Sequence, residues 1–190
     1  MTKSILLVGV GGQGTILASK LFTIGLMEAG FDVKMSEIHG MSQRGGSVSS
    51  QVRFGETVQS PVIDPGSANM IVAFEKMEAL RWLDYLDKDG TVVVNDYEIP
   101  SISVITGEED YAGDVLETIE SKVKTVVVNA AQLAQELGNP KVMNIILLGT
   151  IVKQMKLTSI DWNEIIKNNV KPRFVDINIK ALELGMSLIK

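Results

Sequence analysis

The sequence predicts an α/β fold in three layers, with helices on both faces of a mainly parallel sheet. Two observations predict it. An apolar run at 5–8 is ended by a cluster of glycines and followed at once by apolar residues at helical spacing. Farther along, short β-branched runs alternate with helical patterns, which is the order of βα units. With 190 residues, enough for one sizeable core, the chain is expected to form a single Rossmann-like domain over residues 1–190.

The composition excludes several classes of site. The net charge is −5 and aromatic residues make up 5%, whereas a nucleic-acid-binding surface is normally basic. No apolar run reaches the roughly 20 residues of a membrane helix, and no basic leader precedes the first strand, so we expect a cytoplasmic protein with no membrane partner. With no cysteine and one histidine, the chain lacks the thiolates of an iron–sulfur or Cys-type zinc site. We expect no metal site and no catalytic residue on it.

The first half of the chain is expected to begin with a strand, a glycine turn and a helix over 15–28 that ends at Gly30. A second strand over 31–38 leads into a glycine-rich loop at 39–46. The partial alternation at 47–54 predicts a half-exposed strand, and 57–63 is expected to return beside it as the second strand of an inserted β-hairpin.

The second half is expected to alternate strands and helices. Strands are predicted at 70–74, 91–94 and 123–128, and 102–105 is expected to be an extended piece at an edge. Helices are predicted at 75–86, 108–122, 130–137, 142–155, 161–168 and 173–189. The helix at 142–155 is almost wholly apolar, so we expect it to be buried. Asn144 inside it is expected to be a hydrogen-bonded buried amide or a contact with another helix.

The glycine turn is the first candidate binding site. The spacing Gly9-x-Gly11-x-x-Gly14 between a strand and a helix matches the dinucleotide fingerprint, in which backbone N–H groups receive a phosphate. The predicted ligand-binding residues here are Gly9, Gly11, Gly12, Gln13 and Gly14. The alternative is that these glycines serve only close packing of strand and helix.

A dinucleotide site would also need an acidic residue about 20 positions further on to hold the ribose. Glu37 is the candidate. Alternatively, its carboxylate pairs with Arg44 or Arg53 or faces solvent. The lone histidine, His39, is expected to be structural.

The loop after the second strand is the second candidate site. Its predicted binding residues are Met41, Ser42, Gln43, Arg44, Gly45, Gly46 and Ser47. Because loops at the carboxyl ends of parallel strands share one edge of the sheet, this loop is expected near the first glycine turn. The Arg44 guanidinium would suit a phosphate. The alternatives are a contact with another subunit, or a simple turn with Arg44 in solvent.

Two segments together resemble one family: G-V-G-G-Q-G-T-I-L-A-S-K-L at 9–21 and E-I-H-G-M-S-Q-R-G-G-S-V-S-S-Q-V-R at 37–53. They are similar to the gamma-type domain of 2-oxoacid:ferredoxin oxidoreductases, and within it to the beta subunits of the members that oxidise indolepyruvate. N-I-I-L-L-G at 144–149 and N-I-K-A-L-E-L-G at 178–185 extend the resemblance over the whole chain.

The resemblance implies a subunit of an enzyme that oxidatively decarboxylates arylpyruvates to acyl-CoA and CO2 and reduces ferredoxin. It implies that thiamine diphosphate and the iron–sulfur clusters lie on a larger alpha subunit, which agrees with the lack of cysteine here. Coenzyme A is then the ligand expected at the two glycine-rich loops. A stand-alone module binding NAD or FAD, and a purely structural subunit, are the alternatives.

Overall fold

The structure, a computed structural model, describes residues 2–39, 46–100, 102–108 and 110–189. Of these, the side chains of His39, Ile102 and Ser103 are outside the description. The predicted site residues 41–45 also lie outside the described residues, so their placement stays a prediction.

A six-stranded sheet forms the centre of the fold, in the order β2-β3-β1-β4-β5-β6. Neighbours β1, β4, β5 and β6 run parallel, and β3 is antiparallel to both β1 and β2. The sheet is therefore mainly parallel, as predicted. The strands are β1 (Lys3–Val10), β2 (Asp32–His39), β3 (Ser47–Gly55), β4 (Ala68–Ala73), β5 (Leu86–Asn95) and β6 (Thr125–Val128).

The sheet contains an inserted antiparallel strand, β3, but the predicted pairing of 47–54 with 57–63 was wrong. The partners of β3 are β2 and β1, and residues 57–63 form no strand. Pro61 has no N–H to give a ladder. Instead, β3 side chains bind this segment: Arg53 Nη1 donates to the Ser60 and Val62 carbonyl oxygens at 3.0 and 2.9 Å, and Gln51 Oε1 accepts from the Ile63 N–H.

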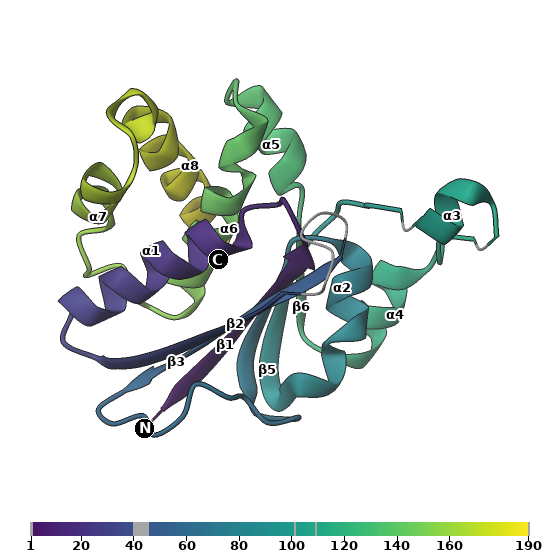
Figure 1. The fold of residues 1–190 in the computed structure, drawn as a ribbon, viewed down its shortest axis with the longest axis horizontal. Coiled ribbons are helices and arrows are strands. Elements are labelled where there is room, and N and C mark those ends of the chain that lie inside the picture. The colour runs from purple at the N-terminus through teal and green to yellow at the C-terminus, as the bar shows by residue number, and fades with distance from the viewer. Residues whose placement is uncertain (1, 40–45, 101, 109, 190) are drawn as a thin grey trace.

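Helices cover both faces of the sheet, which confirms the predicted α/β class (Figure 1). One face carries α1, α5, α6, α7 and α8, and the other carries α2 and α4. The helices are α1 (Thr15–Glu28), α2 (Lys76–Arg81), α3 (Ile102–Thr106), α4 (Val115–Lys122), α5 (Ala130–Glu136), α6 (Met143–Gln154), α7 (Trp162–Asn169) and α8 (Val175–Ser187). Short 3-10 turns are η1 (Leu83–Tyr85), η2 (Pro140–Val142) and η3 (Pro172–Phe174).

Three of the element predictions need correction. Residues 102–106 form the helix α3, not an extended edge piece, and the edge strands of the sheet are β2 and β6. The helix predicted at 108–122 is only α4, which begins after Gly113 and Asp114. The helix predicted at 75–86 ends at Arg81, where η1 leads into a longer β5. In Figure 1, α3 stands out from the rest of the fold.

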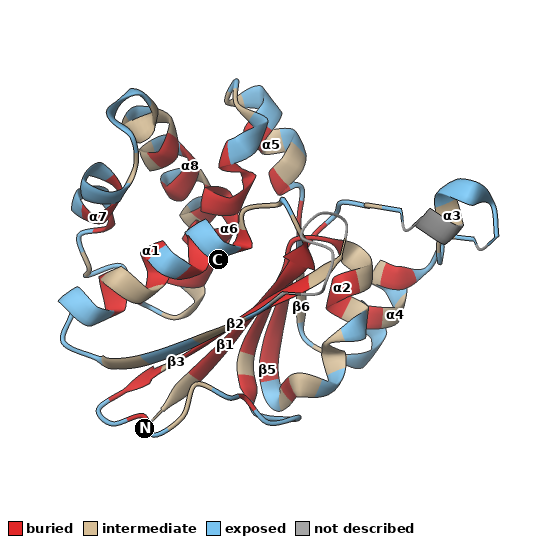
Figure 2. Ribbon diagram, in the orientation of Figure 1, coloured by how far each residue is buried: buried red, intermediate tan, exposed pale blue. Residues whose placement is uncertain are grey.

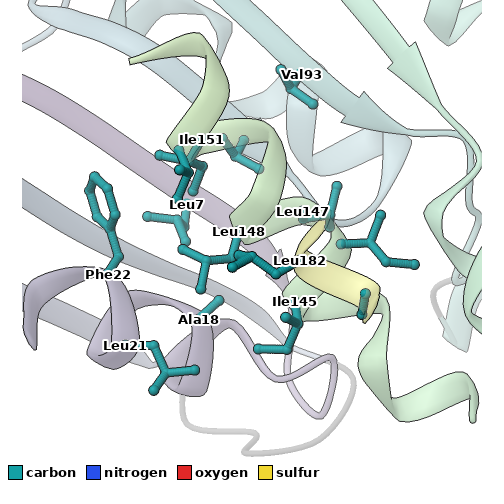
Figure 3. Close-up of a cluster of buried hydrophobic side chains, with 14 of the residues drawn as sticks. Leu7, Ala18, Leu21, Phe22, Val93, Ile145, Leu147, Leu148, Ile151 and Leu182 are labelled. Carbon is teal, nitrogen blue, oxygen red and sulfur yellow. The ribbon is translucent and has the colours of Figure 1, made fainter. Parts of the chain in front are cut away.

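The larger core lies between the sheet and the α1/α6 face. The central strands and α6 are almost wholly buried (Figure 2). Figure 3 shows how this core is assembled: Leu7 comes from β1, Phe22 from α1 and Leu148 from α6. The prediction of a buried apolar helix at 142–155 is thereby confirmed.

Two glycines set the contact between α6 and α8. A Cβ added at Gly149 would collide with the Leu182 carbonyl oxygen, and one added at Gly185 would collide with the Ile146 carbonyl oxygen. The two backbones therefore meet directly, without side chains between them at this point. Only glycine permits such an approach.

Candidate functional site

The turn at 11–14 joins β1 to α1 at the carboxyl edge of the sheet. Gly12 and Gly14 have φ of 104° and 82°, which favours glycine. The Gln13 side chain closes the turn: its Oε1 accepts from the Val10 N–H at 2.7 Å and its Nε2 donates to the Phe74 carbonyl at 2.9 Å. A Cβ at Gly9 would lie 2.8 Å from Gln13 Oε1. Gly9 thus makes room for the side chain that holds the turn.

Gly14 is the N-cap residue of α1, with no side-chain cap and no acidic residue in the first turn. The positive end of the helix dipole and the first N–H groups of α1 are therefore not matched by a carboxylate from that turn. This is the local environment in which an anion binds at a helix N-terminus.

Asn144, from the first turn of α6, packs directly against this cap. Its Nδ2 donates to the Gly14 carbonyl oxygen at 3.1 Å. Its Oδ1 is buried and has no hydrogen-bond partner among the described residues. The prediction of a hydrogen-bonded amide is thus confirmed for one end of the side chain only.

The end of the second glycine-rich loop meets the turn. The Gly11 N–H donates to the Gly46 carbonyl oxygen at 2.9 Å, and Ser47 pairs with Val10 across β3 and β1. The described end of the loop therefore lies where the sequence predicted it.

Glu37 does not occupy the position that a dinucleotide site requires. β3 lies between β1 and β2, so two strand spacings, roughly 10 Å, separate the strand of Glu37 from the strand that ends in the turn. Its carboxylate accepts a hydrogen bond from the Ser19 hydroxyl at 3.4 Å. The Arg53 guanidinium is directed to backbone carbonyls instead. This geometry disfavours a ribose-binding role for Glu37.

A cleft of about 700 Å³ opens beside the turn. Its walls come from the turn itself, from the segment after β5, and from α5, η2 and the start of α6. The lining residues include Gly12, Leu17, Tyr97, Gln135, Lys141 and Asn144. The cleft is mostly apolar with one ammonium group, a surface suited to a ligand with both a phosphate and an apolar portion.

Sequence reasoning missed Tyr97 and Lys141. Tyr97 could have been found, because it follows β5 and the carboxyl ends of parallel strands share one edge. Lys141 carried no such signal, since its place depends on how the chain runs from α5 through η2 into α6.

Two buried carboxylates lie near the same edge, at the start of α2. Glu75 is 1% exposed and caps α2, where its Oε2 accepts from the Glu78 N–H at 2.9 Å. Its Oε1 accepts from the Tyr111 hydroxyl at 2.5 Å. Burial and this hydrogen bond to Glu75 raise the pKa of the Tyr111 phenol. Glu78 is 4% exposed and contacts Ser47 and Arg81.

Among the described residues, no group of three or more His, Asp or Glu side chains could hold a metal ion. In the same part of the chain, no helix has both the length and the apolar character needed to cross a membrane.

Residues 4–188 match the family described as pyruvate ferredoxin/flavodoxin oxidoreductase. The chain is 37% identical over 193 residues to the indolepyruvate oxidoreductase subunit IorB of Pyrococcus horikoshii, covering 98% of this chain and 96% of that protein. The pyruvate oxidoreductase subunit PORC of Thermotoga maritima shares its fold with a TM-score of 0.73 at 22% identity, over 98% and 96% of the two chains.

A third relative is larger. The 2-oxoglutarate:ferredoxin oxidoreductase of Magnetococcus marinus superposes with a TM-score of 0.75 at 18% identity, over 98% of this chain but 31% of that one. The comparisons support an oxidoreductase subunit rather than a stand-alone dinucleotide-binding module, in agreement with the position of Glu37. The chain belongs to the pyruvate ferredoxin/flavodoxin oxidoreductase family.

Proposed function

We propose that this chain is the smaller subunit of an indolepyruvate:ferredoxin oxidoreductase, which converts an arylpyruvate and coenzyme A to acyl-CoA and CO2 and passes the electrons to ferredoxin. The observation that carries the proposal is the 37% identity to an IorB subunit along nearly the full length of both chains. Its partner is a larger subunit with thiamine diphosphate and iron–sulfur clusters. The thiamine supplies the chemistry that breaks the carbon–carbon bond.

Coenzyme A is the ligand proposed for the cleft beside the glycine turn. The α1 N-terminus and the Lys141 ammonium group offer donors to its phosphates, and Leu17 and Tyr97 offer an apolar wall. The solved structure of the Magnetococcus marinus enzyme, which contains this fold, carries coenzyme A and succinyl-CoA, and this supports coenzyme A as the class of ligand.

The role of this chain in the reaction is then to bind coenzyme A and to orient it. The backbone N–H groups at the start of α1 hold phosphate, and Arg44, in the second glycine-rich loop, adds a positive charge to the site. None of these groups forms or breaks a bond of the substrate. Holding the thiol donor near the partner's reaction centre turns an encounter of separate molecules into a step within one complex.

The subunit assignment is tested by expressing this chain and its partner separately and together. Indolepyruvate-dependent reduction of a viologen dye in the presence of coenzyme A is the measurement. We expect turnover by the complex and none by this chain alone. Turnover by this chain alone would contradict the proposal.

The coenzyme A site is tested with Lys141→Ala in the assembled complex. Losing one charge-assisted contact to phosphate should raise the KM for coenzyme A about three- to tenfold and leave that for indolepyruvate unchanged. Lys20→Ala, an exposed lysine on α1 that does not line the cleft, is the matched control. Equal coenzyme A kinetics in both variants would favour a purely structural role for the cleft.

A further inference from the structure

The carboxylate of Glu78 is held against the start of β3. The Ser47 hydroxyl donates to Glu78 Oε2 at 2.5 Å. The other oxygen, Oε1, lies 3.2 Å from Nε of Arg81, whose side chain is 59% exposed. Glu78 itself is 4% exposed. A buried carboxylate is costly unless it is hydrogen-bonded, so the contacts with Ser47 and Arg81 are what allow Glu78 to be buried here.

Ser47 directly follows the residue that contacts the glycine turn. The Gly46 carbonyl oxygen accepts from the Gly11 N–H at 2.9 Å, and Ser47 pairs with Val10. Glu78 therefore holds Ser47 of β3. The preceding residue, Gly46, holds Gly11 of the turn through its carbonyl oxygen. Glu78 is itself held in place, because its backbone N–H donates to the side chain of Glu75, the N-cap residue of α2.

We propose that Glu78 is a positioning residue for the ligand site: through Ser47 and Gly46 it keeps the turn at 11–14 in the form that receives the ligand. The proposal rests on the proposed binding of coenzyme A at this turn. Glu78 does not line the cleft, so its effect on binding is indirect. The Ser47 hydroxyl is already engaged by Glu78, and its contribution is therefore to anchor the strand.

The first experiment measures the turn without any ligand. Amide hydrogen exchange of Gly11 is followed by NMR in the isolated full chain. Ser47→Ala and Glu78→Met should each speed this exchange about tenfold relative to the wild type, because the Gly46 acceptor is no longer held in place. Ser47→Thr keeps the hydroxyl and should restore slow exchange.

Two control variants separate the anchor from its surroundings. Ser49→Ala removes a buried hydroxyl from the same strand that has no hydrogen-bond partner among the described residues. Arg81→Met removes the exposed partner of Glu78 and leaves its contact with Ser47. Both should leave Gly11 exchange unchanged. Unchanged exchange in Ser47→Ala and Glu78→Met would overturn the proposal.

The second experiment measures the KM for coenzyme A and for indolepyruvate in the assembled complex. Glu78→Met should raise the KM for coenzyme A about three- to tenfold, with kcat and the KM for indolepyruvate within twofold of the wild type. Gly12→Ala, which strains the turn itself at φ 104°, serves as the reference. A raised coenzyme A KM in Gly12→Ala but not in Glu78→Met overturns the positioning role. A normal KM in both variants, with faster Gly11 exchange in Glu78→Met, overturns the coenzyme A site while supporting Glu78 as the anchor of the turn.

Discussion

The Asn144 side chain donates a hydrogen bond to the Gly14 carbonyl oxygen at 3.1 Å, and so joins the first turn of α6 to the cap of α1 across 130 residues of sequence. The contact is close: a Cβ at Gly14 would lie 2.7 Å from Asn144 Nδ2. The shape of the glycine turn therefore depends on a helix from the far half of the chain.

Gly14→Ala should lower the free energy of unfolding by about 1–3 kcal/mol, from strain at φ 82° and from the overlap with Asn144. Asn144→Ala alone should cost about 1 kcal/mol for the lost hydrogen bond. Because the double variant no longer has the overlap, its cost should fall below the sum of the two by at least about 0.5 kcal/mol. Urea denaturation of the four proteins measures this, and strict additivity would show that the overlap is relieved without strain.

Arg44→Ala should raise the KM for coenzyme A about tenfold or more in the assembled complex, because one charge-assisted hydrogen bond to a phosphate is lost. The KM for indolepyruvate should not change. Arg44 is outside the described residues, but the loop that contains it ends at Gly46, against the turn. If the variant complex instead dissociates on dilution while its coenzyme A kinetics stay normal, the loop is a subunit contact.

Tyr111→Phe tests the buried hydrogen bond to Glu75. The pKa of the Tyr111 phenol is raised above its ordinary value of about 10 by burial and by this hydrogen bond. A raised pKa in the folded state means that the stabilising contribution is complete below pH 10 and is lost as the pH rises through the folded pKa. We expect the variant to lose about 1 kcal/mol of stability at neutral pH.

Ultraviolet difference spectra between wild type and Tyr111→Phe identify the ionisation of Tyr111. No tyrosinate signal from this residue should develop near pH 10 while the protein stays folded. A signal at that pH from the folded protein would show that the phenol is not held by the carboxylate.

Lys156→Gly should stabilise the protein by about 0.5–1 kcal/mol. Lys156 follows the C-cap of α6 with φ 57°, the one residue other than glycine with positive φ among those described. The Leu157 N–H reaches back to the Val152 carbonyl at 2.9 Å, so the position needs a left-handed backbone. Lys153→Gly, inside the helix, should instead cost about 1 kcal/mol. Thermal unfolding of both variants measures the contrast, and a loss of stability in Lys156→Gly would show that the lysine side chain has a role at this position.

The sequence was sufficient to predict the glycine turn, α1 and the closeness of the second glycine-rich loop to the turn, because these follow from local dihedral needs and from the direction of parallel strands. It was not sufficient for the pairing of β3. Residues 57–63 have an apolar pattern suitable for a strand, but Arg53 and Gln51 bind their backbone through side chains. Nothing local to 47–54 indicated that this strand would enter between β1 and β2.

The candidate site was predictable only where its residues are near in sequence. Asn144 was singled out as a buried amide, but its contact with Gly14 depends on the packing of α6 beside α1. Lys141 reaches the cleft for the same reason. Interactions between the two halves of a fold are set by packing, which periodicity and spacing do not encode.

The glycine contact between α6 and α8 has a mechanical consequence. With the Gly149 and Gly185 regions in direct backbone contact, neither helix can turn about its axis or slide without driving main-chain atoms into each other. Because α6 also carries Asn144, a displacement of the C-terminal helix by a neighbouring subunit would also displace the cap of α1. The C-terminal helix is thus coupled to the glycine turn through α6 and its Asn144 side chain.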